Sequence, residues 1–394
     1  MAGTPNAPLL LIAWGCCLRL ARIQLKHSLT RQTVRLRVAD LESLLELARD
    51  WMPRYGTKVK TVQLTWWTDD DLRDLHRIRA TPERQQAASA AESFIGLGSP
   101  WTSGWRETFD LLDALVAKIL QACSNFLHIK LIEQTLIPVI VCAETNERNE
   151  ISVRSGITSR RTRCALQVAG SRISAADLSF ERFVLAAEKY LDVLDMVPNV
   201  VHLSLRISHD PFSRMPHFFP RLFQPQKLAS LELSDAGIST LTALSAQPCS
   251  TLTQLVLSGM PSLQLAELAD FLKVHPVTTL CLRDIFLSDI QHPFSAPETL
   301  KLKLQNLSVT VETDGALLDL FDAAPLKKVE FCARRGGNTS DRIPPQRITA
   351  FIKKHRASLL SFKLDGVLFD ATEVSAINRS LEQEGVSVRV VAIE

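Results

Sequence analysis

The sequence contains no motif that on its own indicates catalysis or a bound metal. Its eight cysteines form no Cys-x-x-Cys pair, and no pair of histidines stands near them at the spacing of metal ligands, which argues against a zinc site. Gly-x-Ser-x-Gly, phosphate-loop and His-Glu-x-x-His sequences are also missing. The acidic run Asp69-Asp70-Asp71 is more typical of a helix start than of a metal site. We therefore expect a protein that is not an enzyme and that holds no cofactor or metal.

A strong net charge and a long apolar run are missing too. The formal net charge is +3 over 394 residues, which is too small to indicate nucleic-acid binding. An apolar stretch from Pro8 to Leu18 ends at Arg19, whereas a membrane-spanning helix needs about 20 such residues. This stretch also has no basic start and no clear cleavage site, so it does not resemble a secretion signal. Together with cysteines that suggest no disulfide framework, these features predict a cytoplasmic or nuclear protein without a membrane partner.

A short apolar phrase, Leu-x-x-Leu-x-Leu, recurs through the second half of the chain. The last apolar residue of each copy is Leu205, Leu233, Leu257, Leu282, Leu304, Phe331 or Leu364. Each copy is expected to form a strand, and a helix pattern follows most of them, at the spacing of irregular leucine-rich repeats. One such unit cannot bury its apolar face alone, so neighbouring units must stack. The sequence therefore predicts an α/β fold, a leucine-rich-repeat solenoid, which favours macromolecular binding over catalysis.

The same phrase extends the expected solenoid toward the N-terminus. Val59-x-x-Val62-x-Leu64 and Phe126-x-x-Ile129-x-Leu131 predict two earlier strands. We assign residues 39–394 to the solenoid. Residues 1–38 form a short helical segment in this interpretation, with an extended piece at its end.

Two stretches interrupt the repeats and are predicted to be loop insertions. One lies near residues 78–105 and is rich in alanine, glutamine, serine and glycine, and the other lies near residues 144–163 and is polar. After the second insertion we expect a strand at 165–168 and a long helix over about 176–196.

The expected turns lack the asparagine or cysteine that regular leucine-rich repeats place three residues after the last leucine. That position holds Ala236, Met260, Ile285, Leu307 or Val367. The turns must therefore be stabilised by other groups, and irregular intracellular repeats fit better than the regular repeats of surface receptors.

Residues that alternate with the buried leucines are expected to face the concave surface. The candidate partner-binding residues there are Arg206, Glu232, Gln254, Arg283, Lys301, Lys303, Lys328, Glu330 and Lys363. Apart from Arg206, the basic residues of this set are the five in the later strands. This favours a protein target that is acidic or phosphorylated. The alternative interpretation is that the lysines only keep the strand surface soluble.

Residues 12–64 carry a second signal. An apolar helix pattern ends in Leu20-Ala21, Thr33-Val-Arg-Leu-Arg37 follows, and a leucine-rich helix then leads into Val59-x-x-Val62-x-Leu64. This order resembles the back half of an F-box running into the first repeat of a fungal F-box leucine-rich-repeat protein. The chain departs from that family because the tryptophan of its helix falls at Cys17, and because no Leu-Pro-x-Glu segment precedes Ile12.

The resemblance implies a substrate-recognition subunit of an SCF-type ubiquitin ligase. The N-terminal segment would bind a Skp1-like adaptor through Leu11, Ile12, Trp14, Leu18 and Leu20, and the repeat surface would bind the target. Two alternatives stay open. The N-terminal segment could only cap the solenoid, and the protein could be a repeat scaffold or effector-type binding protein with no link to ubiquitin.

Overall fold

The computed structural model describes most of the chain. It describes residues 33–37, 41–68, 82–96, 105–134, 160–180, 193–207, 227–236, 240–260, 262–286, 302–312, 316–332, 343–365 and 369–393. The expectations for residues 1–32 and for most of the second insertion lie outside these ranges. The chain divides into two compact units, Met1–Asp177 and Leu178–Glu394, which we describe separately.

The described residues form an α/β fold with one sheet of 12 strands, ordered β1 to β12 as in the sequence, and every described pairing is parallel. The strands are β1 Thr33–Arg37, β2 Thr61–Thr68, β3 His128–Gln134, β4 Ala175–Phe180, β5 His202–Ile207, β6 Ser230–Ser234, β7 Gln254–Ser258, β8 Thr279–Phe286, β9 Asn306–Glu312, β10 Lys328–Phe331, β11 Ser361–Asp365 and β12 Val390–Ile393. Sequential parallel strands joined by helices are the arrangement of a leucine-rich-repeat solenoid, as the sequence predicts.

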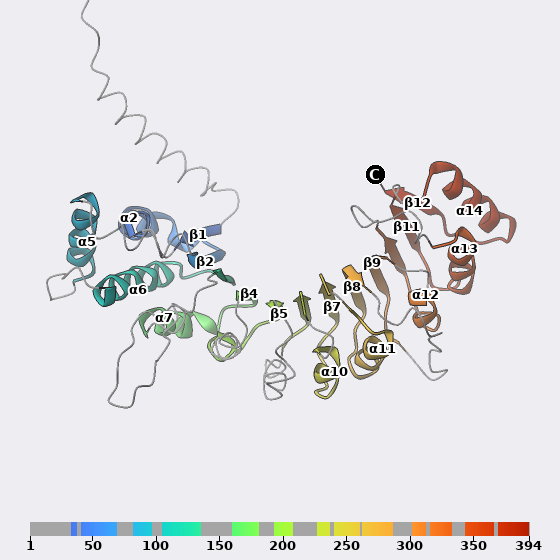
Figure 1. Cartoon of the computed structure of the whole chain (residues 1–394), viewed down its shortest axis with the longest axis horizontal. Helices are drawn as coiled ribbons and strands as arrows, with labels where there is room; N and C mark the ends of the chain where they lie inside the picture. Colours follow the sequence, from blue (N-terminus) through green and yellow to red (C-terminus); the bar gives the residue numbers. More distant parts are fainter. Residues whose placement is uncertain are drawn as a thin grey trace, which may run out of the picture. The chain divides into compact units, whose positions relative to one another are not determined.

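Helices connect many of these strands. They are α2 Leu41–Glu46, α3 Met52–Tyr55, α5 Pro82–Ile95, α6 Trp105–Ala122, α7 Arg160–Gly170, α10 Thr240–Ser245, α11 Leu265–Val274, α12 Ala316–Leu320, α13 Pro345–Lys354 and α14 Ala371–Gln383. A π-helical turn, η1 Leu47–Trp51, and a 3₁₀ turn, η2 Gly56–Lys58, flank α3. In the second unit, α10 to α14 lie along one side of the strands (Figure 1).

The recurring phrase builds the core of the second unit. Leu231 of β6 lies beside Leu203, on β5, and beside Leu255, on β7, and all three are at most 2% exposed. The apolar residue three positions before the first buried leucine of each of these strands, such as Leu228 or Leu252, is fully buried as well. The period-two alternation of a strand therefore puts the last two leucines of the phrase on the helix side.

The repeat at β9 departs from the predicted frame. We expected its strand to end at Leu304, but the strand starts at Asn306, and its buried residues Leu307 and Val309 lie beside Leu280 and Leu282 of β8. Two overlapping alternations are available in this stretch. Only Leu304-x-x-Leu307-x-Val309 keeps the three-residue step of the other repeats, so that frame buries all three apolar side chains.

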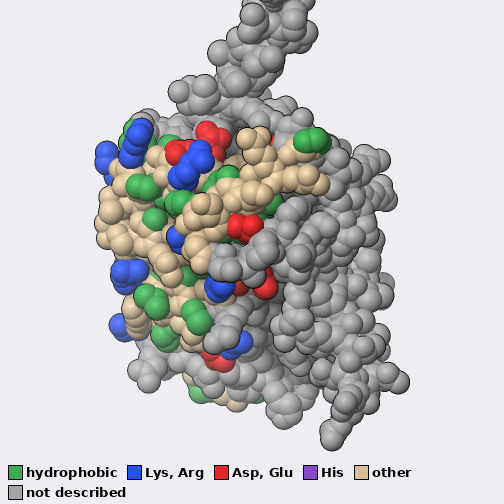
Figure 2. Space-filling view, turned by 90° about the vertical axis from the view of Figure 1, so that its left-hand side faces the viewer, with side chains coloured by type: hydrophobic (Ala, Val, Ile, Leu, Met, Phe, Trp, Pro, Cys, Tyr) green, Lys and Arg blue, Asp and Glu red, His purple; other side chains and the backbone are tan. Residues whose placement is uncertain are grey.

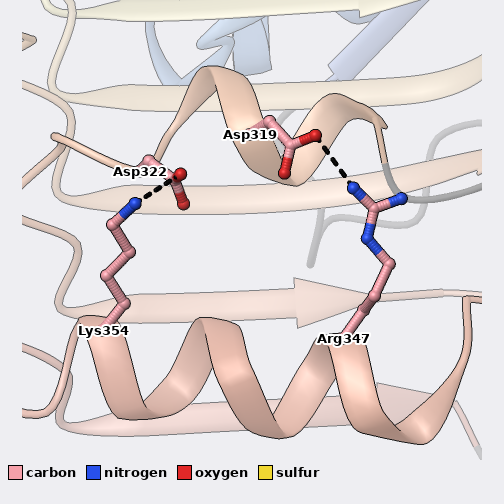
Figure 3. A network of polar contacts seen from close by, with 4 residues as sticks. All are labelled: Asp319, Asp322, Arg347 and Lys354. Carbon is pink, nitrogen blue, oxygen red and sulfur yellow. Dashed lines mark hydrogen bonds and ion pairs between the residues drawn. The ribbon is translucent and has the colours of Figure 1, made fainter. Parts of the chain in front are cut away.

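Ion pairs join neighbouring repeats on the helix side. Arg347, at the start of α13, donates to Asp319 of α12 over 2.8 Å, and Lys354, at the end of α13, pairs with Asp322 just after α12 (Figure 3). These side chains are partly exposed, and surface pairs of this kind contribute at most about 1 kcal/mol each. Buried leucines therefore account for more of the cohesion between repeats than these charges do.

In the first unit the sheet starts earlier than we expected. β1 is the extended piece that we expected at the end of segment 1–38, and it joins the repeat sheet, where Val34 and Leu36 lie beside Val62 and Leu64 of β2. All four side chains are buried. Thr33–Arg37 is therefore a full member of the repeat sheet, because its apolar residues alternate in the same register as those of the next repeat.

The insertion near residues 78–105 is not simply a loop, since α5 occupies 82–95. Ala88 and Ala91 of α5 are almost fully buried and lie three residues apart, on one face of the helix. The alanine and glutamine content that suggested a loop is that of good helix formers, and Pro82 stands at the first helical position.

Two further expectations are wrong around residue 170. Residues 165–168 belong to α7, where Leu166 and Ala169 are buried but Val168 is 75% exposed, a helical pattern of burial. The start of the predicted helix over 176–196 is instead the strand β4. Its sequence matches the recurring phrase as Ile173-x-x-Ala176-x-Leu178. Alanine in place of leucine hid this copy of the phrase.

Asp113 of α6 fixes where α7 begins. Its carboxylate accepts hydrogen bonds from the backbone N–H groups of Arg161 and Thr162 at 2.9 and 2.8 Å, and from the Thr162 hydroxyl at 2.6 Å. These N–H groups have no partner within their own helix, so a carboxylate from the neighbouring helix takes the place of a local cap.

Buried histidines occupy the same place at the ends of α11 and α13. His275 packs against Phe271, and His355 packs against Phe351, four residues earlier in each case. The backbone N–H of Cys249 donates to Nδ1 of His275 over 3.2 Å, and Nε2 lies 3.4 Å from the Leu244 carbonyl oxygen. A neutral ring with its proton on Nε2 satisfies both contacts and links this repeat to the preceding one.

Burial lowers the pKa of His275, although its hydrogen bond to the Leu244 carbonyl acts in the opposite direction. Burial also lowers the pKa of His355, where Lys354 acts in the same direction and Asp322 against it. Because both rings take up protons less readily in the folded chain than in the unfolded chain, stability is fully present above the unfolded pKa of about 6.5 and is lost as the pH falls below it.

We predict that His275→Gln lowers the free energy of unfolding by roughly 1–3 kcal/mol at pH 7.5 and flattens its decline between pH 7 and pH 5. Urea denaturation at several pH values measures both effects. His202→Gln is the matched control, since His202 is exposed, and it should change neither. An unaltered pH dependence in His275→Gln would contradict the assignment.

Candidate binding surface

The helix-free side of β5 to β11 forms the candidate site, and we call it the strand face. It consists of the side chains that alternate with the buried leucines: His202, Ser204, Arg206, Ser230, Glu232, Ser234, Gln254, Val256, Ser258, Thr279, Cys281, Arg283, Asn306, Ser308, Thr310, Lys328, Glu330, Cys332, Ser361 and Lys363. Most are exposed or half-buried, so the face presents polar groups to solvent.

Most of the predicted partner-binding residues lie on this face. Seven of the nine do: Arg206, Glu232, Gln254, Arg283, Lys328, Glu330 and Lys363. Lys303 does not, because it precedes β9, and Lys301 lies outside the described residues. In their place β9 presents Asn306, Ser308 and Thr310, three uncharged residues. We did not predict them from the sequence, because we expected this strand to end at Leu304.

Hydrogen bonds between strands order the polar side chains. The hydroxyls of Ser234 and Ser258 lie 2.7 Å apart on β6 and β7. The Asn306 amide donates to the Thr279 hydroxyl over 3.1 Å between β9 and β8. The sequence shows small polar residues at these positions, but their pairing follows only from the register of the strands.

Backbone groups at the strand ends take the place of the asparagine side chains that regular repeats have in their turns. Asp235, Gly259 and Asp284 occupy equivalent places after β6, after β7 and in the bulge of β8, and all have positive φ, at 59°, 62° and 51°. The Asp235 N–H donates to Ser258 O, and the Gly259 N–H donates to Arg283 O, both over 2.9 Å. Backbone groups of neighbouring repeats thus satisfy one another where a side chain would otherwise do so.

Asp235 is held between two neighbours. Nε of Arg206 donates to its carboxylate over 2.9 Å. On the other side, a Cβ added to Gly259 would lie 2.5 Å from Oδ1 of Asp235. Only a residue without a side chain fits beside this carboxylate, and aspartate tolerates the left-handed backbone better than most residues do.

The centre of the strand face is apolar. Val256 of β7 and Cys281 of β8 lie directly beside each other and are 7% and 9% exposed, although both point to the helix-free side. Polar side chains of the same strands surround them, among them Gln254 and Ser258. The two residues form a small apolar floor within an otherwise polar surface.

The first unit has its own polar strand surface, where His128, Lys130 and Asp177 meet. Asp177 accepts from Lys130 and lies 3.2 Å from Nε2 of His128. Burial alone would raise the pKa of Asp177, but its hydrogen bonds with His128 and Lys130 lower it overall. The charges of Lys130 and Asp177 compensate one another.

Another side of the first unit mixes basic, acidic and apolar side chains (Figure 2).

Among the described residues, no group of three or more His, Cys, Asp or Glu side chains could hold a metal ion. No described helix has the length and apolarity needed to cross a membrane. The five residues expected to contact an adaptor, Leu11, Ile12, Trp14, Leu18 and Leu20, lie outside the described part of the chain.

Comparison with protein-family models and with curated proteins finds no match to this chain. The function must therefore be inferred from the strand face and from the sequence itself.

We predict that Gly259→Ala lowers the free energy of unfolding by roughly 2–3 kcal/mol, because it adds a steric conflict with Asp235 to the cost of the left-handed backbone. Gly385→Ala is the matched control, since Gly385 also has positive φ, at 72°, but a Cβ there meets nothing within 4 Å. It should cost only about 1 kcal/mol. Urea denaturation compares the two variants, and equal losses would show that Asp235 does not confine position 259.

Proposed function

We propose that this chain is a non-enzymatic recognition subunit that binds a protein target on its strand face. The observation that supports this most is the face itself. Seven consecutive strands, β5 to β11, leave their outward side free of helices among the described residues, and ordered hydroxyl and amide groups surround an apolar floor there. Protein-binding surfaces combine an apolar centre with a polar rim in this way.

We further propose that the recognition subunit belongs to an SCF-type ubiquitin ligase. Support for this part comes from the resemblance of residues 12–64 to the back half of an F-box and the first repeat that follows it. The pairing of β1 with β2 agrees with that order, since residues 33–37 lead directly into the repeats. A repeat scaffold or effector-type protein without a ubiquitin link is the alternative.

We predict that the purified chain binds a Skp1-like adaptor and that deletion of residues 1–26 removes this binding, because the expected contacts lie in that segment. A pull-down with purified adaptor measures it, and circular dichroism checks that the truncated chain remains folded. The matched control, Arg283→Glu with Lys328→Glu on the strand face, should retain adaptor binding. A folded full-length chain that does not bind the adaptor would exclude the ligase role and leave the scaffold alternative.

A further inference from the structure

The apolar floor of the strand face is small. Among the described residues, Val256 and Cys281 are its only members, they belong to adjacent strands, and each is less than 10% exposed. Polar residues flank them on their own strands, Gln254 and Ser258 on β7, and Thr279 and Arg283 on β8. An extended segment crossing the strands could therefore place one apolar side chain over this floor and keep its backbone near hydroxyl and amide groups.

Beyond the floor, toward β11, three of the described side chains on this face are basic. Arg283, Lys328 and Lys363 are all exposed, and none of the three makes an ion pair with another described residue. Arg206 differs, because Asp235 neutralises it at 2.9 Å. Glu330 lies directly beside Lys363 in the β10–β11 register and offsets one of the three charges. A second carboxylate, that of Asp284, is exposed next to Arg283 in the sequence, at the bulge of β8.

Between these cations lie three uncharged side chains of β9, Asn306, Ser308 and Thr310. Arg283 lies beside Thr310, and Lys328 lies beside Asn306, so the two cations flank β9 from its two neighbours. Ser308 stands between Asn306 and Thr310 on the same side of that strand. Carboxylates placed over β9 would meet positive charge on both sides and hydrogen-bond donors beneath them.

We propose that the target segment is an extended peptide in which a small apolar side chain, seated on Val256 and Cys281, is followed by acidic residues that lie over β9 between Arg283 and Lys328. This inference rests on the proposed function and specifies its partner. Neighbouring strands lie about 4.8 Å apart and an extended chain rises about 3.3 Å per residue, so the acidic residues fall roughly two to four positions from the apolar one.

The test uses a phage-displayed library of random ten-residue peptides, selected on the full-length chain. We expect enriched peptides to share a small apolar residue followed within two to four positions by aspartate or glutamate. Arg283→Glu with Lys328→Glu should weaken binding of synthetic copies at least tenfold, measured by fluorescence anisotropy. Val256→Ser with Cys281→Ser should weaken it as well.

The matched control is Arg356→Glu with Arg379→Glu, which makes the same change in net charge. Both residues are exposed, one just after α13 and the other on α14, and this variant should bind as the unchanged chain does. Enriched peptides without acidic residues, or binding that withstands the charge reversal at Arg283 and Lys328, would overturn the inference.

A blocked variant, Ser230→Trp with Ser308→Trp, separates this inference from the proposed function. Peptides that bind the unchanged chain, fail on the blocked variant and show no acidic preference would overturn the inference alone. If every enriched peptide binds the blocked variant equally well, then the strand face is not the binding surface, and the proposed function fails with it. Circular dichroism of each variant shows that it is folded.

Discussion

The register between neighbouring parallel strands is the constraint on which the rest of this structure depends. Side chains alternate along a strand, so a shift of one residue would turn every buried leucine of that strand toward solvent. The row that contains Leu231, Leu255, Leu280 and Leu307 shows the constraint satisfied from one repeat to the next, with each of these side chains at most 2% exposed. The apolar residue three positions before the first buried residue of each strand adds a second row.

The same register creates the strand face. Once the leucines face the helices, the residues between them must face away, and hydroxyls on adjacent strands come within hydrogen-bonding distance, as Ser234 and Ser258 do. The left-handed residues Asp235, Gly259 and Asp284 fall at equivalent places for the same reason. The proposed binding function depends on side chains that the core leaves exposed, and the packing of the leucines beneath them sets their positions.

The sequence predicts the fold well because the phrase is read directly from apolar spacing, and it predicts seven of the nine surface residues because alternation follows from it. It fails where spacing is ambiguous. Around Lys303 two alternations overlap, and only the pairing with β8 selects the correct one. The copy of the phrase at Ile173 is hidden by Ala176. The groups that replace the asparagines of regular repeats could not be predicted at all, since they are backbone atoms of neighbouring strands.

The measurement that tests the account most directly is the accessibility of positions 308 and 309 in the folded chain. Ser308→Cys and Val309→Cys variants would be treated with iodoacetamide, and mass spectrometry would follow each cysteine separately, with the buried Cys249 as the internal reference. The register predicts rapid labelling at 308 and protection at 309 similar to that of Cys249. Equal labelling at the two positions, or protection at 308 alone, would contradict the placement of β9 and with it the strand face.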